Sequence, residues 1–102
     1  MKRNPEEIDL EREEAWVGDA VLALFVREWI LRDRGKIDGE AFINFTTNDF
    51  LRTIGNPTAV EAEIGRVYQK NGLQAGFVHI ESKLLPLYLQ REKVRARQMA
   101  RR

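Results

Sequence analysis

The feature that most constrains this chain is its apolar segment AWVGDAVLALFVREWIL, residues 15–31, which carries an aspartate in its first third. Acidic residues precede the segment, as favoured at the start of a helix, and Gly35 follows it, as favoured after the end of one. We therefore predict one long helix over residues 7–33. Its side chains are apolar on nearly every face, so it is either central in the fold or also contacts a partner chain.

The segments after this helix carry the capping residues of shorter helices. Asp38 can cap a short helix that extends to Phe45, and either Thr46 or Thr47 can cap the next one, which Gly55 ends.

Clear boundaries also divide the second half of the chain. Asn56 followed by Pro57 is typical of a helix start, and this helix should cover residues 57–71 and end at Gly72. A last helical region begins at residue 73 and should be kinked or broken by Pro86. No segment alternates with period two for long enough to predict a strand, so the predicted class is all-α.

Composition narrows the range of functions. The 102 residues suit one domain, and the absence of cysteine excludes disulfides and thiolate metal sites. The first residues lack the apolar stretch of a secretory signal, and the apolar run of residues 20–26 is too short to span a membrane. We therefore expect a soluble, cytoplasmic protein without a membrane partner. The net charge of +1 conceals an acidic stretch at residues 6–14 and a basic one at 91–102. The basic end could contact phosphates or simply be a solvated, frayed helix end.

Asp19 is the unusual residue of the long helix. Helical spacing places Ala15, Gly18 and Leu22 beside it, and the two small residues would let another helix approach closely. A buried carboxylate needs a cation, a hydrogen-bond network or water. Asp19 therefore indicates either a metal site or an ion pair with an arginine.

The helix that begins at Pro57 has a matching face. Thr58, Glu61, Ala62 and Gly65 share one side of it by the same spacing. Two such helices could place Asp19 and Glu61 around one magnesium ion, which prefers oxygen ligands and keeps several waters. Alternatively, Glu61 only complements the dipole of its helix.

Two motifs in this order resemble those of the ribonuclease III family. EREEAWVGDAVLALFVREWIL, residues 11–31, resembles the family's signature helix, and TAVEAEIGRVY, residues 58–68, resembles its second motif. FTTN, residues 45–48, is similar to the start of an intervening family helix. The resemblance covers roughly residues 10–90, and it predicts one ribonuclease III-like domain with a core of about residues 7–90 and a basic tail of about 91–102.

The resemblance implies an all-helical homodimer that cleaves both strands of double-stranded RNA with magnesium, or manganese in its place, and leaves 5′-phosphates. By motif position, Asp19 and Glu61 correspond to catalytic metal ligands. The signature helix forms the family's dimer contact, which here corresponds to Trp16, Val17 and Ala20.

Two further acids of the full-length bacterial enzymes are absent, because this chain has Ala15 and Thr58 at those places. The Mini-III branch is similar to this chain at both positions and also lacks a double-stranded-RNA-binding domain. This resemblance implies a precursor of ribosomal RNA as substrate. We expect Thr58 to orient a water beside the metal. Glu14 lies one residue from Ala15 and should point about 100° away, so it does not replace the missing acid.

The segment between Asp19 and Glu61 is shorter than is usual even in Mini-III enzymes, and the missing part lies near the RNA in the family. Two alternatives therefore stay open: an inactive RNA-binding or ribosome-binding dimer, and a structural helical dimer whose Asp19 pairs with an arginine. His79, the only histidine, should be a surface or packing residue. The basic residues expected to hold RNA, together with the tail, are Arg52, Arg66, Lys70 and Lys83.

Overall fold

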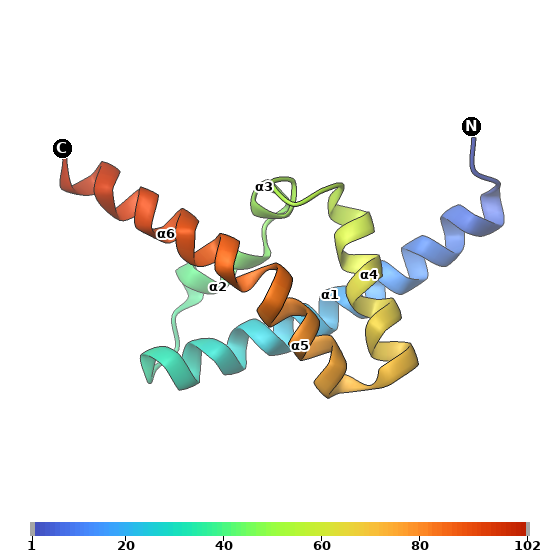
Figure 1. Ribbon diagram of the computed structural model, residues 1–102, viewed down its shortest axis with the longest axis horizontal. Coiled ribbons are helices and arrows are strands. Elements are labelled where there is room, and N and C mark those ends of the chain that lie inside the picture. The colour runs from blue at the N-terminus through green and yellow to red at the C-terminus, as the bar shows by residue number, and fades with distance from the viewer. Residues whose placement is uncertain (1, 102) are drawn as a thin grey trace.

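The long apolar segment forms helix α1, Pro5–Arg34, in a computed structural model that describes residues 2–101 (Figure 1). The side chain of Asn4 caps the helix by accepting a hydrogen bond from the Glu7 amide. Gly35 ends the helix in the left-handed conformation, with φ 75°. The predicted helix of residues 7–33 is confirmed. It begins two residues earlier because Asn4 and Pro5 repeat the same start signal as Asn56 and Pro57.

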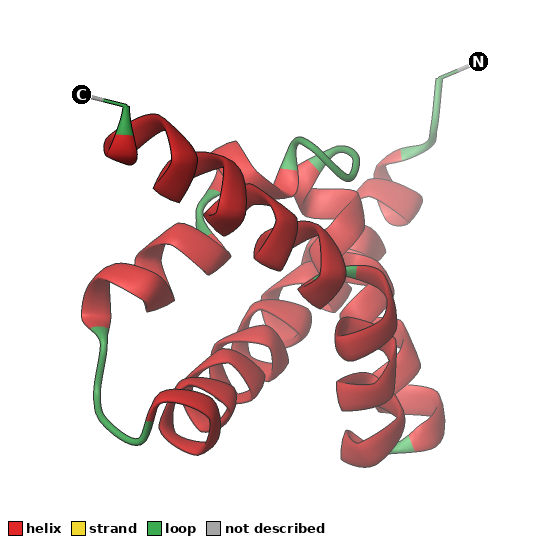
Figure 2. Cartoon of the chain, turned by 60° about the vertical axis from the view of Figure 1, so that its left-hand side comes forward, coloured by secondary structure: helices red, strands yellow, loops and turns green. Residues whose placement is uncertain are grey.

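Five more helices complete the described chain, and residues 2–101 contain no strand, so the all-α class is confirmed (Figures 1 and 2). The figures show α2 between α6 and the C-terminal part of α1, with α4 and α5 toward the other end of the molecule. The bounds of these helices are α2, Gly39–Thr46; α3, Asn48–Leu51; α4, Pro57–Asn71; α5, Leu73–Lys83; and α6, Leu85–Ala100.

The predicted caps hold, with one correction. Asp38, Thr47 and Asn56 each accept a hydrogen bond from the backbone amide three residues later. The prediction of a helix that continues to Gly55 was wrong, because α3 ends at Leu51. Residues 52–55 instead form tighter turns, in which the Thr53 amide and hydroxyl both donate to the carbonyl three residues before.

The predicted break near Pro86 is confirmed and falls between α5 and α6. Pro86 lies in the first turn of α6, where its missing amide hydrogen costs no helical hydrogen bond. Leu84 between the two helices is 1% exposed, so the break is fixed by burial in the core.

The core lies where α1 meets α2, α4, α5 and α6, and aromatic rings fill much of it. Phe45 of α2 stacks on Tyr88 of α6 with ring centroids 4.4 Å apart. Phe50 and Trp29 meet Tyr88 edge-on, at 5.7 and 6.0 Å. Such pairs add to the stabilisation that burial itself provides.

Helix α6 is fastened to the end of α1 by a polar cluster. Arg34 binds both carboxylate oxygens of Glu92, at 3.0 and 2.6 Å, and the Tyr88 hydroxyl donates to the same carboxylate at 2.7 Å. Burial alone would raise the Glu92 pKa, but these hydrogen bonds outweigh it and lower the pKa. Arg91 pairs with Asp49 after α2. The basic segment is therefore helical to Ala100 and anchored at its base.

One face of α1 is uncovered. Trp16 is 82% exposed and Leu24 is 39% exposed, and Asp19 and Ala20 are also exposed. The expectation that Asp19 is a buried carboxylate was therefore wrong, and residues 2–101 contain no buried charged side chain. The helix is covered by its own chain on one side only, which is why an apolar pattern on every face did not bury the aspartate.

Within residues 2–101, no helix combines the length and the apolar character needed to cross a membrane.

Candidate metal centre

The candidate centre lies where α1 crosses α4, and two glycines make this crossing close. A Cβ atom on Gly18 would lie 2.8 Å from the Gly65 amide nitrogen, and one on Gly65 would lie 3.0 Å from the Gly18 nitrogen. Each would lie closer still to a carbonyl oxygen of the opposite helix, that of Glu61 or Glu14. Backbone therefore contacts backbone, as the small residues on both predicted faces indicated.

The crossing is nearly symmetric, which makes its two sides comparable. Glu14 and Glu61 each stand four residues before the glycine of their own helix, and Asp19 and Arg66 each stand one residue after it. On one side, Arg66 donates two hydrogen bonds of 3.1 Å to Glu14. The other side brings the side chains of Asp19 and Glu61 together. The same geometry thus holds an ion pair on one side and two acids on the other.

The electrostatics of Glu61 reflect this unbalanced pair. Partial burial raises the Glu61 pKa to about 7, and a hydrogen bond to Asp19 and the negative charge of that residue act in the same direction. Asp19 forms no salt bridge with any arginine or lysine within residues 2–101. The alternative in which Asp19 pairs with an arginine is therefore not seen within the described chain.

The two acids face an open depression of about 390 Å³ between α1 and α4. Thr58 of α4 lines the same depression and is partly buried. Two adjacent carboxylates and a hydroxyl are oxygen groups of the kind that magnesium binds, and their accessibility leaves room for water and a phosphate. Residues 2–101 contain no group of three potential ligands from His, Cys, Asp and Glu, so the protein offers two acids. The lining is completed by Arg12, Ala15 and Trp16.

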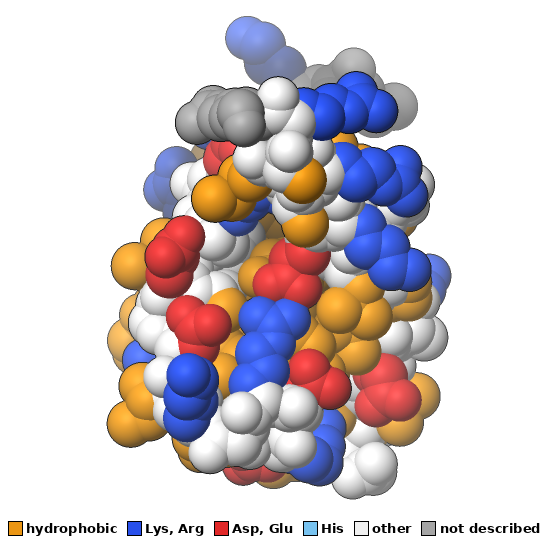
Figure 3. Space-filling model, turned by 90° about the vertical axis from the view of Figure 1, so that its left-hand side faces the viewer, with side chains coloured by type: hydrophobic (Ala, Val, Ile, Leu, Met, Phe, Trp, Pro, Cys, Tyr) orange, Lys and Arg blue, Asp and Glu red, His pale blue; other side chains and the backbone are white. Residues whose placement is uncertain are grey.

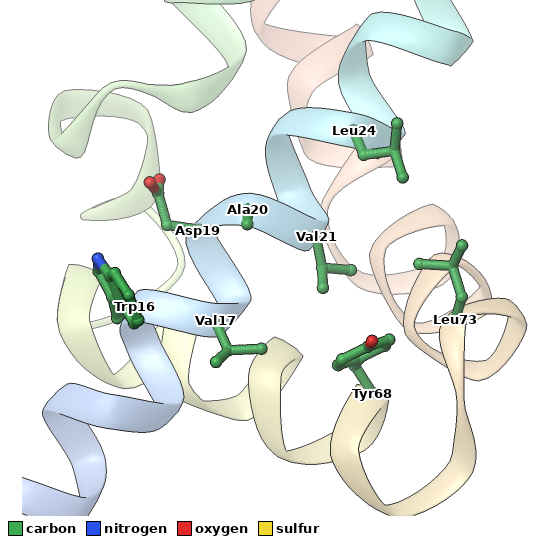
Figure 4. A pocket seen from close by; sticks show the side chains of 8 residues that line it. All are labelled: Trp16, Val17, Asp19, Ala20, Val21, Leu24, Tyr68 and Leu73. Atoms are coloured by element: carbon green, nitrogen blue, oxygen red, sulfur yellow. The ribbon is translucent and has the colours of Figure 1, made fainter.

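A larger apolar groove, of about 570 Å³, adjoins the depression on the uncovered face of α1 (Figure 4). Trp16 and Asp19 stand at one end of it, and Leu24 and Leu73 stand at the other. The residues expected at a dimer contact all line this groove, which is formed by Trp16, Val17, Asp19, Ala20, Val21, Leu24, Tyr68 and Leu73.

The residues expected to hold RNA are more scattered. Arg52, Lys70 and Lys83 are exposed, whereas Arg66 is occupied by its ion pair with Glu14. None of these residues lines the depression. Lys and Arg side chains gather on the upper part of the face in Figure 3, toward the end of α6.

Glu14 does not line the depression, as its position on the helix predicted, and pairs with Arg66 instead. His79 is partly buried, with Nε2 3.9 Å from Glu63, and burial lowers its pKa. Arg12 was missed by the sequence analysis. It stands seven residues before Asp19, and this spacing alone would have placed it on the same face of the helix.

No protein-family model, curated protein or solved structure matches the chain.

Proposed function

We propose that this protein is a magnesium-dependent endoribonuclease that cleaves double-stranded RNA as a homodimer. The observation that carries the proposal is the pair of adjacent acids, Asp19 and Glu61, that face one open depression from two helices in backbone contact. The reaction is inferred from the resemblance of the two motifs to those of the ribonuclease III family, and the depression is the place where we expect it to occur.

Asp19 and Glu61 would hold the cation between them, and manganese could replace magnesium. When bound, the ion supplies an activated water and neutralises charge that develops on the scissile phosphate. Glu61 must give up the proton that its raised pKa retains before it can serve as a ligand. The Thr58 hydroxyl, on the same wall as Glu61, orients a water molecule in the depression.

A second copy of the chain would cover the apolar groove. The groove presents Trp16, Val17 and Ala20 side by side, and an exposed tryptophan with an apolar surround is typical of a protein interface. Because the depression shares Trp16 and Asp19 with the groove, the dimer would carry two catalytic centres beside its interface.

The substrate we propose is a structured precursor of ribosomal RNA in the cytoplasm. Side chains cannot read the deep major groove of an RNA duplex, so recognition would rest on phosphates, 2′-hydroxyls and shape. Exposed cations suited to this role include Arg52, Lys70 and Lys83, with the basic end of α6. Arg66 contributes less because Glu14 neutralises it.

A second candidate function is an RNA-binding or ribosome-binding dimer that does not cut. It is favoured by the small number of acids, since residues 2–101 provide no third Asp, Glu, His or Cys beside the pair. In that case the basic residues still bind RNA, but Asp19 and Glu61 do not take part in any cleavage.

The test is incubation of the purified protein with long duplex RNA in magnesium, beside Asp19→Asn and a sample with EDTA. We expect cleavage by the unsubstituted protein alone, into products with 5′-phosphates. Cleavage by Asp19→Asn would show that the pair of Asp19 and Glu61 is not required for the reaction, and would refute the proposed metal centre. Binding without cleavage would support the second candidate function.

Dimerisation is tested separately by size-exclusion chromatography with light scattering. We expect Asp19→Asn and Glu61→Gln to remain dimeric, because these acids serve the metal, and Trp16→Ala to shift toward the monomer. A monomeric unsubstituted protein would contradict the proposed interface.

A further inference from the structure

Among the described residues, 2–101, Arg12 is the one cation on the wall of the depression that holds Asp19 and Glu61. It stands on α1 two turns before Asp19, and Trp16 lies between them on the same face of the helix. Its side chain is exposed and therefore accessible to a ligand in the depression.

Two of the acids close to Arg12 in sequence have other partners. Glu11 pairs with Arg3 at 2.9 Å, and Glu14 pairs with Arg66 at 3.1 Å. Arg12 itself forms no salt bridge within residues 2–101. The guanidinium of Arg12 is therefore open to a ligand, although acidic residues surround Arg12 in the sequence.

We propose that Arg12 binds a backbone phosphate that flanks the scissile one, and so positions the RNA strand over the acid pair. This inference rests on the proposed function. A guanidinium suits the task because its fork of donors matches phosphate oxygens and its charge is permanent. A strand that places one phosphate at Asp19 and Glu61 brings a neighbouring phosphate past Arg12.

The spacing along α1 favours a neighbouring phosphate over the scissile one. Seven residues of helix separate the backbone positions of Arg12 and Asp19 by about 10 Å. A phosphate held between Asp19 and Glu61 is therefore not also centred on Arg12. Its role is to position the strand, and its loss should act on binding and on the site of cleavage more than on the chemical step.

The experiment measures binding of a duplex RNA by fluorescence polarisation over a range of salt, in an Asp19→Asn background that does not cut. Arg12→Ala should weaken binding about tenfold, as expected for one charged hydrogen-bonded contact. It should also lower the salt dependence of log Kd by about one. Arg12→Lys should restore the salt dependence, because it restores the charge. The matched control is Arg32→Ala, which removes an exposed arginine from the other end of α1 and should change neither quantity.

Cleavage assays with Asp19 intact provide the second measurement. Arg12→Ala should raise KM with little change in kcat, and should spread the cleavage positions on a duplex that the unsubstituted protein cuts at few places. Equal binding and equal cleavage positions for Arg12→Ala and the control would overturn the inference while leaving the nuclease intact. Loss of the dimer in Arg12→Ala would assign Arg12 to the interface and also overturn it. If the unsubstituted protein neither cuts nor binds duplex RNA, the proposed function fails, and this inference with it.

Discussion

Replacing Asp19 by arginine should stabilise the metal-free protein and abolish its response to magnesium. The reason lies in the symmetry of the helix crossing, which places Asp19 opposite Glu61 as it places Arg66 opposite Glu14. In Asp19→Arg the introduced guanidinium would meet Glu61, and the two sides of the crossing would carry the same kind of ion pair.

The magnitude follows from the existing pair. Arg66 and Glu14 form two hydrogen bonds of 3.1 Å, with 44% and 12% of their side chains exposed. A partly exposed pair of this kind contributes up to about 1 kcal/mol. Asp19→Arg also removes the repulsion that helps to raise the Glu61 pKa, a gain that solvent screening reduces. We expect about 1 kcal/mol in total, which corresponds to a rise in Tm of roughly 4–8 °C for a domain of this size.

The assay is thermal unfolding followed by circular dichroism at pH 7, in EDTA and in millimolar magnesium. The control is Glu13→Arg, which makes the same change of charge at an exposed position outside the depression. In EDTA, Asp19→Arg should melt above both the unsubstituted protein and the control, and only Asp19→Arg should lose the stabilisation by magnesium. A lower Tm in EDTA than that of the control would refute the argument from symmetry. Stabilisation by magnesium that persists in Asp19→Arg would place the cation elsewhere.

Three other predictions test the crossing, the titration of the acid pair and the attachment of α6. Gly18→Ala should lower the free energy of unfolding by about 3 kcal/mol or more, because the added Cβ would meet backbone atoms 2.7 and 2.8 Å away. Gly39→Ala is the control for chemical denaturation and should be nearly neutral, because a Cβ there would meet no atom within 4 Å. The metal-free protein should lose stability from pH 4.5 to about 7, since the folded state holds the Glu61 proton more tightly than the unfolded chain; a slope of Tm against pH that survives Glu61→Gln would contradict this. Glu92→Gln should lower the free energy of unfolding by about 1–2 kcal/mol, because it removes the closer of the two carboxylates that pair with the partly buried Arg34, and Glu81→Gln at an exposed position is the comparison for the urea midpoint.

Local signals in the sequence predicted most of the fold. Capping chemistry involves residues close in the chain, so Asp38 and the Asn56–Pro57 pair marked helix starts that the structure confirms. The same signal at Asn4 and Pro5 starts α1 two residues before the predicted helix. The end of α3 was mispredicted because the helix gives way to tight turns at residues 52–54, and no capping residue marks this change in the sequence. Gly55 ends the turns and not the helix.

The candidate site was only partly predictable. Helical spacing placed Asp19 and Glu61 on faces with small residues, and the structure brings these faces together at Gly18 and Gly65. The burial of Asp19 was mispredicted because an apolar pattern shows which faces avoid water and does not show which faces another element covers. The assignment of Arg66 to RNA failed to anticipate Glu14 for a related reason, since their pairing depends on how α1 and α4 cross.

The contact between Gly18 and Gly65 also bears on how the protein folds. It joins helices that lie far apart in the chain, whereas α2 meets α3 and α5 meets α6 through short connections. Bringing α1 and α4 together closes a long loop, and the entropy lost in doing so is offset only when the two helices pack. The pair of Asp19 and Glu61 therefore exists only after this contact between distant segments has formed. If the crossing is absent from the folding transition state, a divalent cation will leave the folding rate nearly unchanged and will lower the unfolding rate. The bound ion would then stabilise the native state kinetically, without helping it to form.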